Sequence, residues 1–175
     1  MKKRIKKTIV IAIISLLGIA ALAGCSAGAK KDAYSKMQDQ GYAVMGLDDT
    51  FAPMGFRDEK GELAGFDVDL AKAVFERIGI EIKLQPIDWS MKETELNSGN
   101  IDLIWNGYTI TKERQQKVAF TKPYLDNSQI IITLANSGID TKKDLNGKKV
   151  ALQNESSAVD AINTEPDWVA ALDGG

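Results

Sequence analysis

Between Tyr42 and Trp105 the chain alternates short apolar runs with longer amphipathic runs, and this alternation constrains the fold more than any other feature. Three apolar runs have the length of strands: 42–47, 80–86 and 101–105. The run 65–79 starts with acidic residues and ends in glycine, and 90–99 has a candidate Ser-x-x-Glu capping box and a closing glycine. Both predict helices. Crossovers of this length return the chain in the same direction, so we predict an α/β fold with a parallel sheet.

Three loops leave the carboxyl ends of these predicted strands, where open α/β sheets bind their ligands. The loops cover 48–53, 88–89 and 106–114. A hairpin turn is predicted over 57–61, because turn-forming residues separate two apolar stretches there. We therefore expect a ligand site at the edge of the sheet that these loops share.

The first 24 residues have the pattern of a secretory signal. Five basic residues precede an apolar run over 9–23, which at 1.5 Å per residue covers about 22 Å and falls short of the roughly 30 Å of a bilayer core. The segment resembles a bacterial lipoprotein signal, in which Cys25 is diacylated on sulfur and becomes the first mature residue. An ordinary secretory signal is the alternative. The residues up to 40 are expected to form a flexible tether.

Charge and composition exclude several kinds of chemistry. The whole chain has 22 basic and 24 acidic residues, and removal of 1–24 changes the formal charge from −2 to −7. We therefore expect no nucleic-acid binding, and membrane contact through the lipid alone. The chain has no histidine and a single cysteine, which excludes imidazole or thiolate catalysis and His or Cys zinc sites. We predict no cofactor, no metal and no enzyme activity.

Three motifs carry a resemblance to a known family. They are GFDVDLAKAVF at 65–75, IDLIWNGYTITKER at 101–114 and VAFTKPY at 118–124. In this order, behind the lipoprotein signal, they resemble the bacterial extracytoplasmic solute-binding proteins, family 3, which deliver polar amino acids to ABC importers. The resemblance implies a periplasmic-binding-protein-like, type II bilobal fold. It also implies a monomer that docks to an ABC permease and holds an amino acid such as glutamine or cystine between its lobes.

The resemblance also divides the chain. A first α/β lobe is expected over 41–134, closing with a hinge strand at 129–134. Residues 135–175 are expected to begin a second lobe, with a turn at Asn146-Gly147 and a strand from Lys149. About 40 residues seldom fold unaided, so we expect this second lobe to be incomplete and the chain to be a fragment that binds weakly or not at all by itself.

The ligand's charged groups are assigned by the resemblance to the loop 106–114. The family's carboxylate-binding arginine matches Arg114, whose guanidinium can donate two parallel hydrogen bonds. Thr109 and Gly107 match positions whose hydroxyl and carbonyl accept from the ligand ammonium. Without the resemblance, Arg114 would be interpreted as a solvated helix residue, Thr109 as a strand-end residue and Gly107 as a turn residue.

The remaining candidates fall into two groups. One group would contact the ligand's side chain, and the other would give the ligand's carboxylate a second set of hydrogen-bond donors. Phe51 and Trp89 match two aromatic walls, although either could be a core residue. Asp48 matches a position that reads the ligand side chain, with a loop-capping role as the alternative. Ser156 and Ser157 could donate to the carboxylate from a helix start, with a plain N-cap as the alternative.

Two further hypotheses stay open at this point. A periplasmic dehydratase acting on prephenate-like acids has the same fold, and a sensor or nonfunctional fragment is a third possibility. Glu155 departs from the family, whose members commonly have glycine there, and a carboxylate beside a carboxylate site is unfavourable unless it points outward. Asp67 and Asp69 are assigned to the helix dipole and left outside the site.

Overall fold

The computed structural model describes residues 32–173, so the predicted signal peptide and Cys25 lie outside the described residues. The chain divides into two compact units, Met1–Lys36 and Met37–Gly175. Helix α2 (Ala33–Gln40) crosses their boundary. The predicted flexible tether is therefore wrong over 33–40. Its helix begins after Asp32, whose carboxylate accepts from the Ser35 amide at 2.8 Å and caps the first turn.

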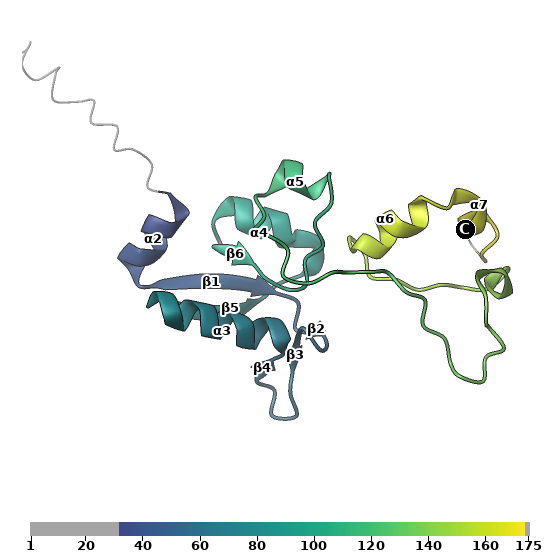
Figure 1. Ribbon diagram of the computed structural model, residues 1–175, viewed down its shortest axis with the longest axis horizontal. Helices are drawn as coiled ribbons and strands as arrows, with labels where there is room; N and C mark the ends of the chain where they lie inside the picture. The colour runs from purple at the N-terminus through teal and green to yellow at the C-terminus, as the bar shows by residue number, and fades with distance from the viewer. Residues whose placement is uncertain (1–31, 174–175) are drawn as a thin grey trace, which may run out of the picture. The chain divides into compact units, whose positions relative to one another are not determined.

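Two small sheets form the body of the second unit (Figure 1). The parallel sheet has the order β5-β1-β6, with bounds Glu81–Pro86, Tyr42–Leu47 and Leu103–Ile104. The antiparallel sheet has the order β2-β3-β4, with bounds Thr50–Phe51, Gly55–Arg57 and Leu63–Ala64. The predicted parallel sheet and the predicted hairpin turn at 57–61 are both confirmed.

Helix α3 (Phe66–Ile78) covers the face of the parallel sheet where its core lies. The odd-numbered residues of β1 are fully buried and pack against α3, because alternate side chains of a strand point to one face. The contacting residues are Ala43, Met45 and Leu47 from β1 and Val68, Ala71 and Phe75 from α3. Gly79 follows α3 with φ 70°, the left-handed conformation that closes a helix.

Short helices connect the remaining parts. The 3-10 helix η1 (Trp89–Met91) leads into α4 (Lys92–Ser98), and α5 (Arg114–Lys117) follows the loop after β6. The predicted Ser90–Glu93 capping box is wrong. Asp88 caps this region instead, because its carboxylate accepts from the Ser90 amide at 2.8 Å. Gly99 closes α4 as predicted.

The C-terminal part of the described chain contains helices but no strand between residues 135 and 173. It consists of η2 (Lys142–Leu145), α6 (Ser157–Asn163) and α7 (Pro166–Ala170). The strand predicted from Lys149 and the hinge strand predicted over 129–134 are not strands in the structure, and Ile132 is 85% exposed. A strand requires a pairing partner, and no described segment supplies one here. Of the helices within 32–173, none combines the length and apolar character needed to span a bilayer.

Candidate ligand-binding site

The ends of β1, β5 and β6 bring the predicted loops together. β1 lies between its two neighbours, with Leu47 in register with Pro86 and Gly46 in register with Ile104. The residues after these strand ends therefore start from one edge of the sheet, as the sequence predicts. Loop 106–113 then leads to α5, which presents Arg114.

Arg114 is buried rather than solvated. The residue is only 6% exposed. Its guanidinium donates hydrogen bonds to two main-chain carbonyls, from Nη1 to Thr109 at 3.1 Å and from Nη2 to Glu155 at 3.0 Å. The guanidinium carbon also lies 4.6 Å from the centre of the Tyr108 ring. The alternative of a solvated helix arginine is therefore wrong.

Thr109 and Gly107 lie on the loop that leads to Arg114, and the Thr109 carbonyl accepts from its guanidinium. The Thr109 and Ser157 hydroxyl oxygens are 3.1 Å apart, and Thr109 Oγ1 also accepts from the Asn127 amide at 2.7 Å. Gly107 has φ 58°, a conformation that favours glycine, and a side chain there would approach the Phe51 ring at 3.3 Å. The structure therefore brings together residues that are 48 positions apart in sequence, Thr109 and Ser157.

Asp48 and Trp89 line a cavity of about 460 Å³ at the ends of β1 and β5. Asp48 is buried, and its carboxylate accepts from the Thr50 amide and hydroxyl and, at 2.6 Å, from the Gln153 amide. The cavity also contains Asp88, whose pKa is lowered by hydrogen bonds from the Ser90 hydroxyl and amide. Its lining is completed by Asp49, Thr50, Ile87, Ser90, Gln153 and Asn154.

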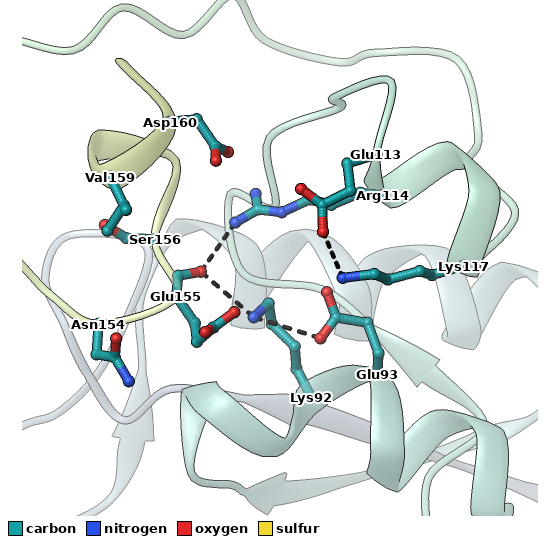
Figure 2. Close-up of a pocket in the computed structure, with 10 residues that line it drawn as sticks. All are labelled: Lys92, Glu93, Glu113, Arg114, Lys117, Asn154, Glu155, Ser156, Val159 and Asp160. Atoms are coloured by element: carbon teal, nitrogen blue, oxygen red, sulfur yellow. Dashed lines mark hydrogen bonds and ion pairs between the residues drawn. The ribbon is translucent and has the colours of Figure 1, made fainter. Parts of the chain in front are cut away.

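A second cavity, of about 230 Å³, is lined by Arg114 and Lys92 (Figure 2). The Glu155 carbonyl faces both Arg114 and Lys92 there, as the dashed lines in Figure 2 show. Ser156 precedes α6, yet its hydroxyl makes no capping hydrogen bond, and its Oγ is buried without a partner in the described part of the chain. Ser156 therefore occupies the N-cap position of α6, as the alternative interpretation expects, but its hydroxyl does not cap the helix. Glu155 itself is exposed.

Two aromatic residues take different positions. Trp89 is buried and meets the Tyr108 ring edge-on, with 5.5 Å between ring centres. Phe51 is 42% exposed and lies next to Gly107. Trp89 thus lines the cavity of Asp48, whereas Phe51 is partly exposed and lines neither cavity.

The sequence interpretation missed several polar residues around this site. Lys92 is 1% exposed, and Glu93 accepts from the Tyr108 hydroxyl at 2.6 Å. Burial opposes ionisation of Glu93, but hydrogen bonds from Tyr108 and Lys92 lower its pKa overall. Burial, reinforced by Glu93, raises the pKa of Tyr108. The only sequence signal was the i, i+4 spacing of Lys92 and Leu96, which places Lys92 on the partly apolar side of α4.

The helix dipole alone does not account for the environment of Asp67. Asp67 is fully buried, and its Oδ1 accepts from the Tyr124 hydroxyl at 2.6 Å. A side chain at Gly107 would lie 4.0 Å from Asp67 Oδ2. Asp67 therefore lies close to Gly107, although it does not line either cavity.

Comparison with known proteins identifies the family. Residues 43–173 match the bacterial extracellular solute-binding proteins, family 3. The chain belongs to this family, and its fold is part of a bilobal type II periplasmic-binding-protein fold.

Individual relatives agree with this assignment. The L-cystine-binding protein TcyJ of Escherichia coli K12 is 33% identical over 145 residues, covering 81% of this chain and 54% of the relative. An ABC uptake transporter substrate-binding protein of Streptococcus pneumoniae with bound histidine is 48% identical, with a TM-score of 0.76, covering 79% of this chain and 56% of that one. An ancestral amino-acid-binding protein, a precursor of cyclohexadienyl dehydratase, is 30% identical with a TM-score of 0.72, covering 79% and 61%. The chain thus spans little more than half the length of such relatives.

Proposed function

We propose that this protein captures a polar amino acid outside the cytoplasm and delivers it to an ABC permease, held to the membrane by a lipid on Cys25. The observation that carries the proposal is the burial of Arg114 in the wall of a cavity that Ser156 also lines. Burying a guanidinium is costly unless it has partners. Arginine has five N–H donors, and two of them bond main-chain carbonyls in the described chain, which leaves donors for a ligand carboxylate.

The ammonium of the same ligand would meet acceptors on the loop 106–109. Thr109 and Gly107 precede Arg114 by five and seven residues, and the Thr109 carbonyl accepts from Arg114 Nη1 at 3.1 Å, so one zwitterion could reach both charged sites. The Ser157 hydroxyl lies 3.1 Å from that of Thr109 and would complete the enclosure from the opposite segment. These groups serve the part of the molecule that all amino acids share, and they do not select among side chains.

Selection is assigned to the cavity of Asp48 and Trp89. Asp48, Asp49 and Asp88 line it, and the carboxylate of Asp49 already pairs with Arg57 at 2.6 Å. Asp48 and Asp88 instead accept hydrogen bonds from uncharged partners, so their negative charge favours a ligand side chain that donates hydrogen bonds or carries positive charge. Phe51 would cover the ligand's aliphatic carbons. Histidine, bound by the Streptococcus pneumoniae relative, and cystine, in the name of TcyJ, are the first ligands to test.

The test is a thermal-shift screen of the twenty amino acids and cystine on protein that begins at residue 26. A ligand present at about 100 times its Kd stabilises the folded state by about 2.7 kcal/mol. The chain is expected to bind weakly by itself, so we expect at least one polar amino acid to raise the unfolding temperature only when it is present at millimolar concentration. A saturable NMR titration extends the same screen to millimolar affinity. If no amino acid acts in either measurement, the proposed function is wrong.

A dehydratase-like enzyme is the second candidate, favoured by the resemblance to the dehydratase precursor. It predicts product formation from prephenate or arogenate. Turnover of either compound, with no stabilisation by amino acids, would replace the transport proposal by the enzymatic one.

A further inference from the structure

Lys92 is a buried cation that the proposed ligand site does not use directly. Its ammonium donates to the Trp89 carbonyl at 3.1 Å and to the Glu155 carbonyl at 3.3 Å, and it lies 3.4 Å from the Glu93 carboxylate. The residue is 1% exposed, whereas most lysines are solvated. An apolar residue would occupy this place at a lower desolvation cost. What a lysine adds here is its directed hydrogen bonds to the two carbonyls.

The Glu155 carbonyl receives two cations. Arg114 Nη2 and Lys92 Nζ both donate to it, from helices α5 and α4 respectively (Figure 2). Two cations converging on one oxygen repel each other, and the Glu93 carboxylate next to Lys92 offsets this. The Tyr108 hydroxyl bonds the other oxygen of Glu93, and its ring lies under Arg114. The polar contacts form a closed ring of side chains around the Glu155 carbonyl.

Glu155 needs such support because its backbone is strained. Its φ is 56°, and it is the only non-glycine residue with positive φ in the described chain. Left-handed backbone is unfavourable for a residue with a Cβ and persists where the surroundings fix it. Ser156 and Ser157 follow directly, and the Ser157 hydroxyl lies opposite Thr109. The conformation of residue 155 therefore sets the position of these hydroxyls.

We propose that Lys92 is a positioning residue for the ligand site: its buried ammonium, balanced by Glu93, holds the Glu155 carbonyl against Arg114 and so places Ser157 opposite Thr109. The part of this inference that concerns ligand binding rests on the proposed function. The juxtaposition of residues 109 and 157 can nevertheless be measured without a ligand.

The test uses a cross-link between Thr109→Cys and Ser157→Cys in protein beginning at residue 26, which has no other cysteine. Oxidised glutathione forms the disulfide, and its rate in the folded state reports how often the two positions meet. We expect Lys92→Met to slow the cross-link at least about tenfold. The matched control is Lys117→Met, since Lys117 lines the same cavity but pairs with Glu113 at 2.7 Å. This control is expected to leave the rate unchanged.

To separate global destabilisation from positioning, the unfolding of each variant is followed first. Cross-linking is then measured under conditions well below the unfolding midpoint of that variant. If Lys92→Met alone does not fold, the double variant Lys92→Met/Glu93→Gln removes the buried ammonium together with its half-buried counter-charge and carries the same expectation. Equal cross-linking rates with and without Lys92 would overturn the proposal. A slowed cross-link in a protein that binds no amino acid would leave the role of Lys92 standing and reject the proposed function.

Discussion

The guanidinium of Arg114 lies over the ring of Tyr108, with 4.6 Å between the guanidinium carbon and the ring centre. Phe120 stacks with the same ring at 5.2 Å, and Trp89 meets it edge-on. The aromatic ring therefore fixes the plane of the guanidinium from one side, while main-chain carbonyls accept its hydrogen bonds.

Replacing Tyr108 by leucine should weaken amino acid binding by about fivefold, since a cation–π contact in a partly buried site contributes about 1 kcal/mol. The affinity is measured by NMR titration with the best ligand of the screen. Tyr42→Leu is the matched control, because it removes another cation–π contact, with Lys83 at 3.2 Å, outside the two cavities. Equal losses in both variants would show that Tyr108 has no specific effect on Arg114.

Asp48→Asn should reduce the affinity for a cationic or hydrogen-bond-donating side chain by about tenfold, because a hydrogen bond to a charged group contributes about 1.5 kcal/mol. Asp49→Asn removes a carboxylate from the same cavity, but one that already pairs with Arg57. Calorimetry on both variants should show a clear loss only for Asp48. A larger loss for Asp49 would contradict the assignment of side-chain selection to Asp48.

Asp67 predicts a specific pH dependence of stability. Burial raises its pKa, against the opposing hydrogen bond from Tyr124, so the folded protein holds this proton more tightly than the unfolded chain. The stabilisation from the bound proton is complete below the unfolded pKa and is lost as pH rises through the folded pKa. Asp67→Asn should therefore be more stable, relative to the wild type, at pH 7 than at pH 4. Denaturant unfolding at the two pH values measures this difference.

Asp69→Asn is the control for the Asp67 experiment, since Asp69 is exposed on the same first turn of α3. Both substitutions remove the same favourable charge from the helix N-terminus. If they change stability in parallel at both pH values, the helix dipole alone explains Asp67.

Gly65→Ala should destabilise the fold by about 3 kcal/mol, because φ is 130° there and a Cβ would lie 2.4 Å from the Met54 carbonyl oxygen. Gly61 has φ 83° but open space around it, so Gly61→Ala should cost only about 1 kcal/mol. Urea unfolding of the two variants gives the comparison. Similar costs would mean that the Met54 contact relaxes freely.

Features encoded within a few residues were predictable from the sequence. The acidic start of α3 and its closing Gly79 fixed that helix, and the apolar run of β1 identified the buried strand. The loop carrying Arg114 was found through a motif that is continuous in the sequence. Each of these signals is local, so no distant partner had to be known.

Features that depend on distant partners were not predictable in this way. Residues 129–134 and the segment that starts at Lys149 have the composition of strands, but a strand also needs a neighbouring strand to pair with. Lys92 was overlooked because nothing near it in sequence shows that it meets the Glu155 carbonyl, 63 positions later. The burial of Asp67 likewise depends on Tyr124, 57 positions later.

The central claim is that Arg114 receives the carboxylate of an amino acid, and a titration of 15N-labelled protein beginning at residue 26 tests it most directly. The side-chain Nε–H signal of Arg114 and the amides of Gly107 and Ser157 should shift together and saturate with one amino acid, whereas the corresponding decarboxylated amine should have no effect. Arg114→Met should abolish the saturable shifts at Gly107 and Ser157, and Lys117→Met should retain them. Saturable shifts of the same size in Arg114→Met, or with the amine, would contradict the account.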